Sequence, residues 1–234
     1  MTENKLKVLA NPQVRENYLI RNVYGYMSAG LALTALVAFL TSQSSAMIRF
    51  LYSNAILTIV LFVVQIGLVI YLSSQLEKMS ERAAIFTFFG YSAVTGLVLS
   101  SIFLVYAGTT IYSAFLVAAL MFLGASVYGT LTKRNLASWG NYLFMGLWGL
   151  IIASVVSLFF PGINFVVSLV GVVLFAALTA YDTRRIVEMN REFGQEMTKE
   201  EYTKLGIIGA LNLYLDFLNI FLYLLRLFGA SNRD

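Results

Sequence analysis

The sequence predicts an all-α, polytopic membrane protein with seven transmembrane helices. Of its 234 residues, 59% are hydrophobic and only 12% are charged, which is too apolar for an ordinary soluble domain. The apolar residues form runs of about 20, the length that a helix needs to cross a bilayer. Basic residues collect in alternate connections between these runs, as they do in multi-pass membrane proteins. Together these patterns predict a helical bundle within the membrane.

The seven helices follow from windows of about 19 residues. The predicted spans are Val23 to Leu40, Ala55 to Ser73, Ala84 to Ala107, Ile111 to Leu131, Tyr142 to Phe160, Asn164 to Asp182 and Leu205 to Phe228. The short connections at Gly108 to Thr110 and at Pro161 and Gly162 make the helices that they join antiparallel neighbours. We predict a polar N-terminal segment 1–22, one transmembrane domain 23–229 and a C-terminal tail 230–234.

Two further segments can be interpreted from polarity. The first 20 residues are too polar to contain the apolar core of a cleavable signal peptide, so the first apolar run should stay in the membrane. The connection Thr183 to Lys204 carries charges of both signs, and we expect a solvated amphipathic extension there.

In the third helix, Ser92, Gly96 and Ser100 recur every four residues. Small residues at this spacing favour close helix packing.

The orientation follows from the basic residues. With the N-terminus in the cytoplasm, the cytoplasmic segments hold all 16 basic residues except Arg49, Arg226 and Arg233. Six spans would break this alternation, so we predict seven spans, a cytoplasmic N-terminus and an external C-terminus. Outer-membrane barrels show weaker alternating segments of about ten residues. The long apolar runs therefore indicate the inner membrane.

The composition also limits the chemistry. The chain contains no cysteine and no histidine, which excludes disulfides, thiol nucleophiles, the usual zinc sites, haem ligation and Ser-His triads. We predict no cofactor and no enzymatic activity. The net charge of +4 is explained by topology, and no basic patch with interleaved aromatic residues predicts nucleic-acid binding.

The last predicted helix carries an aspartate, Asp216, near its middle. An ionised carboxylate at the centre of a bilayer costs roughly 2.5 to 3.5 kcal/mol on insertion scales, and such residues usually face the bundle interior. A polar stripe runs along the same helix face at spacings of three and four residues: Asn212, Asp216, Asn219, Tyr223 and Arg226. This stripe predicts either hydrogen bonds between helices or an ionisable site in a pathway.

A second aspartate, Asp182, closes the sixth predicted helix beside Arg184 and Arg185. It can be a solvated interfacial residue, or it can approach Asp216 if the sixth helix continues past Asp182 or the seventh is shifted. Two carboxylates in a low-dielectric site cannot both ionise cheaply, so such a pair shares a proton. The protonated pair can lock two helices, whereas the doubly ionised pair can open a path or transiently contact Ca²⁺.

Two segments resemble the transmembrane Bax inhibitor motif family, in its bacterial inner-membrane branch. They are Leu213 to Phe221, followed by Leu224 to Gly229, and the preceding pair Tyr181 and Asp182. The resemblance implies a seven-helix fold with a central last helix. It also implies a pH-sensitive Ca²⁺ leak and a di-aspartyl sensor formed by Asp182 and Asp216.

The resemblance points to supporting polar residues as well. Some bacterial relatives carry an acidic residue within the second helix, where the nearest polar residue here is Gln65. They also carry an arginine near the cytoplasmic end of that helix that can engage the aspartates. Here the basic residues in the following connection are Lys78 and Arg82.

Three functions fit these observations. The first is a pH-sensitive leak channel for Ca²⁺ or other cations. The second is a non-conducting regulator of membrane-protein quality control, because some bacterial members are linked to a membrane-bound protease. The third is an intramembrane aspartyl protease. Against the third, Tyr214 and Leu215 precede Asp216 where such enzymes have a glycine-rich approach, and Pro12 and Pro161 are the only prolines.

Overall fold

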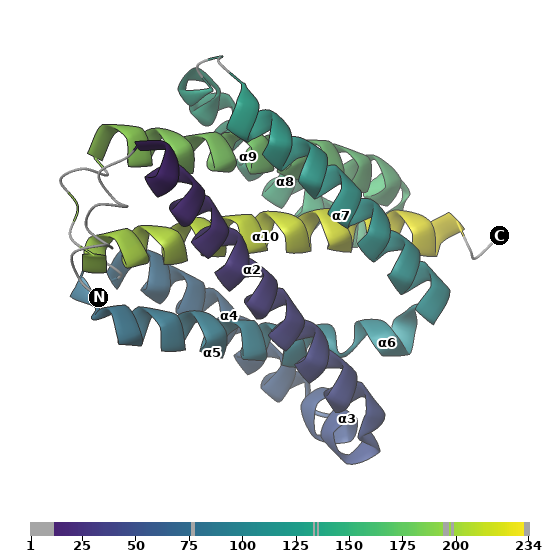
Figure 1. Ribbon diagram of the computed structural model, residues 1–234. Helices are drawn as coiled ribbons and strands as arrows, with labels where there is room; N and C mark the ends of the chain where they lie inside the picture. The colour runs from purple at the N-terminus through teal and green to yellow at the C-terminus, as the bar shows by residue number, and fades with distance from the viewer. Residues whose placement is uncertain are drawn as a thin grey trace. The chain divides into compact units, whose positions relative to one another are not determined.

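The computed structural model describes residues 12–75, 78–132, 134, 136–193, 197 and 199–231. Within these residues the secondary structure is helical (Figure 1). The α-helices are α2 (Pro12–Gln43), α3 (Ser45–Tyr52), α4 (Ala55–Gln75), α5 (Glu81–Leu99), α6 (Ile102–Val105), α7 (Gly108–Leu131), α8 (Gly140–Phe159), α9 (Asn164–Phe193) and α10 (Lys199–Ser231). Two short 3₁₀ turns, η2 (Ala137–Trp139) and η3 (Pro161–Ile163), precede α8 and α9.

Seven helical stretches are long and apolar enough to cross a membrane. They are Val14–Gln43, Ala55–Gln75, Glu81–Val105, Gly108–Leu131, Gly140–Phe159, Pro161–Glu192 and Glu200–Ala230. Each contains most or all of one predicted span, so the prediction of an all-α, seven-span membrane protein is confirmed. Residues 12–22 of the polar N-terminal segment are already helical, as the first part of α2.

One prediction about the connections is wrong. The segment Thr183 to Lys204 is predicted to be a solvated amphipathic extension; its described residues are amphipathic, but they are not a solvated connection, because α9 continues as a helix to Phe193 and α10 begins at Lys199. Residues 194–196 and 198 of this segment lie outside the described residues. Ile186 and Val187 are buried there. Hydropathy windows ended the sixth helix at Asp182 because charged residues follow it. A helix can place such residues on one face while its apolar face packs against protein.

The chain forms two compact units, and α10 contributes to both. The first unit comprises the described parts of Met1–Val105 and Met189–Tyr214. In it, α2 crosses α5 (Figure 1). A Cβ added at Gly96 would lie 2.7 Å from the Thr34 carbonyl oxygen, and one at Gly30 would lie 2.8 Å from the Phe88 ring. These close approaches explain the small residues of the predicted third helix.

The second unit comprises the described parts of Tyr106–Glu188 and Leu215–Asp234. Its helices also approach closely at glycines. A Cβ added at Gly171 of α9 would lie 2.6 Å from the Tyr223 ring of α10. A Cβ at Gly129 of α7 would collide with the carbonyl of Ala180 on α9. Helix α9 is therefore packed closely against α7 at Gly129 and against α10 at Gly171.

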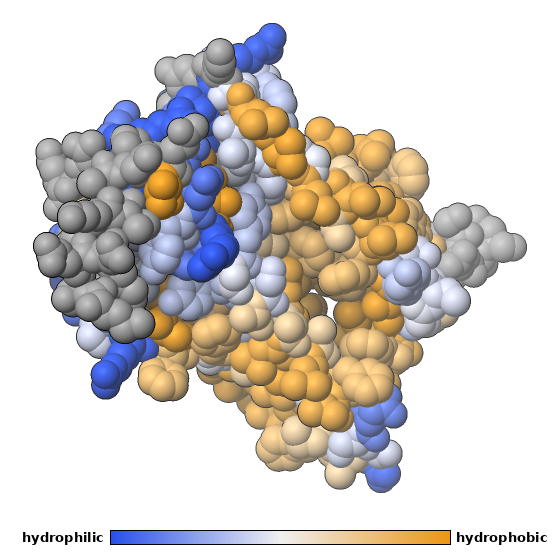
Figure 2. Space-filling view, viewed as in Figure 1, coloured by the Kyte–Doolittle hydropathy of each residue, from blue (hydrophilic) through white to orange (hydrophobic). Residues whose placement is uncertain are grey.

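The outer surfaces of the helices are apolar. Leu131, Leu158 and Phe86 are each more than 70% exposed, and Figure 2 shows broad hydrophobic areas on the face in view. In an apolar 18-residue stretch of α4 only 6% of the stretch is buried by protein, whereas in the corresponding stretch of α10 the buried share is 72%. Protein therefore covers most of the last helix within the described residues. Lipid, rather than protein, covers the exposed apolar side chains of such a bundle.

Candidate functional site

Asp216 lies in the second unit, on the buried face of α10. Its side chain is 5% exposed, and its Oδ2 atom has no hydrogen-bond partner in the described part of the chain. A buried carboxylate without partners is costly, because it loses its hydration without a compensating interaction. The surroundings of Asp216 therefore determine what this residue can do.

Helix α9 supplies two polar groups that interact with Asp216. Thr179 and Asp182 are three residues apart, which places them on one face of the helix. The Thr179 hydroxyl and the charge of Asp182 both act electrostatically on the Asp216 carboxyl. Thr179 is fully buried and Asp182 is half-buried. The structure thus brings together the two aspartates that the sequence predicted as a pair.

The continuation of α9 explains how the pair forms. The sequence indicated that the carboxylates would meet if the sixth helix continued past Asp182, and α9 does continue, to Phe193. Asp182 is therefore an interior residue of a long helix rather than a residue at a helix end.

Thr179 was not predicted, although its role has a simple geometric basis. Its hydroxyl donates to the Phe175 carbonyl oxygen at 2.8 Å. A hydroxyl proton can rotate between acceptors, so Thr179 can donate either to this carbonyl oxygen or to the Asp216 carboxylate. The only sequence signal was a hydroxyl residue one helical turn before Asp182.

Helix α7 closes the site on another side. Close packing at Gly129 brings its backbone against Ala180 and Thr183 of α9, next to Asp182 in sequence. The ring centroids of Phe122 and Phe217 lie 5.7 Å apart in an edge-to-face arrangement. Phe217 directly follows Asp216. Residues adjacent in sequence to both aspartates therefore pack against α7.

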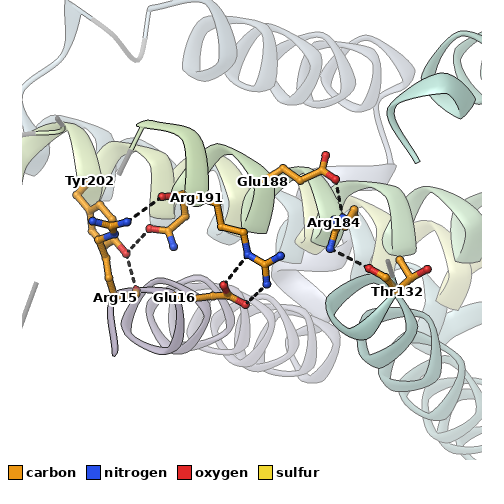
Figure 3. Close-up of polar contacts among 8 residues, drawn as sticks. Arg15, Glu16, Thr132, Arg184, Glu188, Arg191 and Tyr202 are labelled. Atoms are coloured by element: carbon orange, nitrogen blue, oxygen red, sulfur yellow. Dashed lines mark hydrogen bonds and ion pairs between the residues drawn. The ribbon is translucent and has the colours of Figure 1, made fainter. Parts of the chain in front are cut away.

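The cationic residues after Asp182 have different roles. Arg184 donates to the Glu188 carboxylate at 2.6 Å and to the Thr132 carbonyl oxygen at 2.8 Å (Figure 3). Arg185 is exposed and interacts electrostatically with Asp182. Arg185 is thus the cation beside the pair, whereas Arg184 connects α9 to the end of α7.

The remaining residues of the α10 stripe make local contacts. The Asn219 amide donates to the Leu215 carbonyl oxygen of its own helix at 2.8 Å. The Tyr223 hydroxyl lies 3.4 Å from that of Ser154, and its ring stacks on Phe175. Arg226 is exposed, with its guanidinium 5.6 Å from the centroid of the Tyr223 ring. A pathway role for Asn219 and Arg226 stays a prediction.

The other predicted residues belong to the first unit. The Gln65 amide donates to the Thr95 hydroxyl at 3.3 Å. Lys78 and Arg82 are exposed, and Asn212 is half-buried. Their proposed support of the aspartates stays a prediction.

The first unit contains a buried hydroxyl cluster around Tyr214. The hydroxyl of Thr34 lies 2.7 Å from that of Tyr214 and donates to the Ser92 carbonyl oxygen at 2.8 Å. The Thr95 hydroxyl donates to the Tyr91 carbonyl oxygen at 2.9 Å. We call Thr34, Ser92, Thr95 and Tyr214 the hydroxyl cluster. It was not predicted, because hydroxyl residues scattered over three helices leave no pattern in the sequence.

The described residues contain no group of three or more acidic, histidine or cysteine side chains that could hold a metal ion. Ca²⁺ takes six to eight oxygen ligands in proteins, more than the two side chains of the aspartate pair can supply. Transient contact of Ca²⁺ with Asp182 and Asp216 stays a prediction. The chemistry that this arrangement supports directly is proton sharing.

Comparisons with known proteins extend over nearly the whole chain. The family model described as "Inhibitor of apoptosis-promoting Bax1" matches residues 16–233. The inner membrane protein YbhL of Escherichia coli is 42% identical, over 94% of this chain and 95% of its own length. An uncharacterized protein of Borreliella burgdorferi is 40% identical, over 100% of this chain and 99% of its own.

These matches include both segments on which the resemblance rested, together with all seven spans. The chain therefore belongs to the Bax1 inhibitor family of membrane proteins.

Proposed function

We propose that the protein is a pH-sensitive leak channel for Ca²⁺ in the bacterial inner membrane, gated by Asp182 and Asp216. The observation that carries the proposal is the buried Asp216 carboxyl, which has an unpartnered oxygen and has Asp182 and Thr179 beside it. A site that needed only hydrogen-bonding glue would use an amide, because a buried carboxylate is far more costly.

The gate would work through the shared proton. With one proton between them, the aspartates hold α9 and α10 together through a shared hydrogen bond. When the pair loses this proton, two carboxylates in a low-dielectric site repel each other. Repulsion separates the two helices and leaves oxygen ligands for a passing cation. We therefore expect Ca²⁺ flux to rise with pH.

The location rests on two arguments. The relative YbhL is named as an inner membrane protein, and the seven apolar helices of this chain suit the same membrane. The distribution of basic residues then favours a cytoplasmic N-terminus and an external C-terminus. In this orientation Asp182 and Arg185 lie on the cytoplasmic side of α9, so the gate would respond to cytoplasmic pH.

The test is Ca²⁺ flux into proteoliposomes over a range of pH. Wild type should show flux that rises with pH. The double variant Asp182→Asn, Asp216→Asn keeps the shape of both side chains but cannot ionise, so its flux should be low and independent of pH. Glu200→Gln is the matched control, because it removes an exposed carboxylate from α10 and should leave the pH response intact.

Two results would contradict the proposal. A pH response that survives in the double variant would remove the aspartates from the gate. Absence of flux from folded wild type at every pH would favour the non-conducting regulator, whose membrane-bound protease partner would then be sought by co-purification.

A further inference from the structure

A separate cluster of buried polar side chains lies in the first unit, where three helices begin or end. Arg15 is in the first turn of α2, Asn190 in the last turn of α9 and Tyr202 in the first turn of α10. They are 2%, 0% and 6% exposed. The Tyr202 hydroxyl lies 2.6 Å from the Arg15 carbonyl oxygen and 3.0 Å from Asn190 Oδ1 (Figure 3). We call Arg15, Asn190 and Tyr202 the helix-end cluster.

The helix-end cluster has more donors than acceptors. The Arg15 guanidinium reaches the Asn190 carbonyl oxygen only at 3.5 Å, the outer limit for a hydrogen bond. Arg15 Nε and Asn190 Nδ2 have no hydrogen-bond partner among the described residues and are closed off from solvent. Each unsatisfied buried donor costs about 1–3 kcal/mol, and more where the group is charged. The two unpartnered groups therefore require acceptors.

The carboxylate that adjoins Arg15 in sequence already forms an ion pair with another residue. Glu16, which follows Arg15 in the chain, accepts from Arg191 at 2.9 Å and 3.2 Å in a two-pronged ion pair (Figure 3). No ion pair found among the described residues includes Arg15. A buried guanidinium without a counter-ion is strongly unfavourable. An anionic oxygen would satisfy both the charge of Arg15 and the two free donors of the helix-end cluster.

The position of the cluster indicates the kind of anion. The ends of transmembrane helices lie at the level of lipid headgroups, and basic pockets between such helices bind anionic headgroups. The N-termini of α2 and α10 add the positive ends of two helix dipoles. Tyr18, 41% exposed, stacks on Tyr202 with ring centroids 6.1 Å apart, as is common for aromatic residues at the membrane interface.

We propose that Arg15 and Asn190 form a binding site for an anionic phosphate group, carried by a phospholipid headgroup or free in solution. Arg15 Nε and Asn190 Nδ2 donate to its oxygens, and the guanidinium supplies the counter-charge. Because both donors are covered, the side chains around them must move to admit the phosphate. Binding joins the ends of α2, α9 and α10, so it stabilises the folded protein.

The test is the thermal stability of the full chain in a neutral detergent. Phosphatidylglycerol, phosphatidylcholine and inorganic phosphate are added separately. For a lipid site, phosphatidylglycerol should raise Tm by about 5 °C or more, with little effect of the zwitterionic lipid. An equal effect of inorganic phosphate would assign the site to the free ion. No stabilisation by either anion would overturn the proposal.

Two arginine variants on α2 make the test specific. Arg15→Gln should lose the stabilisation, whereas Arg21→Gln, the same change at an exposed position of α2, should keep it. An equal shift in Arg15→Gln and wild type would overturn the assignment.

A third variant tests phosphate binding at the helix-end cluster if Arg15→Gln fails to fold. Asn190→Asp keeps the acceptor for Tyr202 and places a carboxylate beside Arg15. It should raise Tm without added anion and remove the effect of phosphatidylglycerol. Retention of the full lipid effect in Asn190→Asp would contradict the proposal.

Discussion

The two halves of α10 bury polar groups in opposite ways. In the first unit, Tyr214 joins the hydroxyl cluster, whose hydrogen bonds to Thr34 and Ser92 lie between 2.7 and 2.8 Å. In the second unit, Asp216 has an oxygen without a partner and another aspartate beside it. Tyr214 and Asp216 are two residues apart, so they face directions about 200° apart around the helix.

This difference distinguishes a helix contact that does not depend on pH from one that responds to pH. Hydroxyl groups stay neutral at every physiological pH, so a satisfied cluster of them ties helices together in the same way under all conditions. A buried carboxyl pair changes charge with pH, and its geometry changes with its charge. We infer that the hydroxyl cluster is a constant contact in the first unit and that the aspartate pair is the variable contact in the second.

The largest expected effect is at Gly129. A Leu side chain there would collide with the Ala180 carbonyl and with Thr183, and overpacking of a rigid contact typically costs about 1–3 kcal/mol or more. Because α9 must move away, we expect Gly129→Leu to lower Tm strongly and to disturb the aspartate pair. Gly124, on the same helix with open space around it, is the control, and Gly124→Leu should unfold near the wild-type temperature.

The next effect concerns the pH dependence of stability. Ionisation of buried Asp216 opposes folding, so wild-type Tm measured in detergent should fall as pH rises. Asp216→Asn removes the ionisation, and its Tm should be higher than wild type at high pH and nearly flat. Asp182→Asn should have a smaller effect, because Asp182 is half-buried. Parallel Tm curves for wild type and Asp216→Asn would contradict this prediction.

A smaller effect is expected at Thr179. Thr179→Val keeps the shape of the side chain but removes the hydroxyl that can donate to the Asp216 carboxylate. We expect a displaced midpoint in the flux–pH curve, with the amplitude retained. Thr179→Ser keeps the hydroxyl and should restore the wild-type midpoint. If the Val and Ser variants behave alike, the hydroxyl has no part in positioning Asp216.

The smallest effect is expected in the hydroxyl cluster. Tyr214→Phe removes one hydroxyl that bonds to Thr34, at a cost of about 0.5–1.5 kcal/mol. The ring still packs edge-to-face on Phe88 and Tyr91. We expect Tm to fall by a few degrees at all pH values, with the pH response of flux unchanged. An altered pH response would show that the two halves of α10 do not act separately.

The sequence by itself determined the number, order and approximate limits of the spans, because hydropathy is a local property that does not depend on which helices meet. It also identified Asp216, since one carboxylate in an apolar helix stands out without any neighbours. Its partner was predicted only conditionally, because composition cannot show whether a helix such as α9 continues through charged residues.

Only the tertiary structure decided which faces meet. It placed Thr179 beside Asp216, brought Gly129 against the backbone of α9 and assembled the helix-end cluster from residues up to 187 positions apart. These contacts depend on the rotation and register of whole helices, which many weak packing interactions set together. A burial pattern along one helix shows that a face is covered, but the covering residue belongs to another part of the chain.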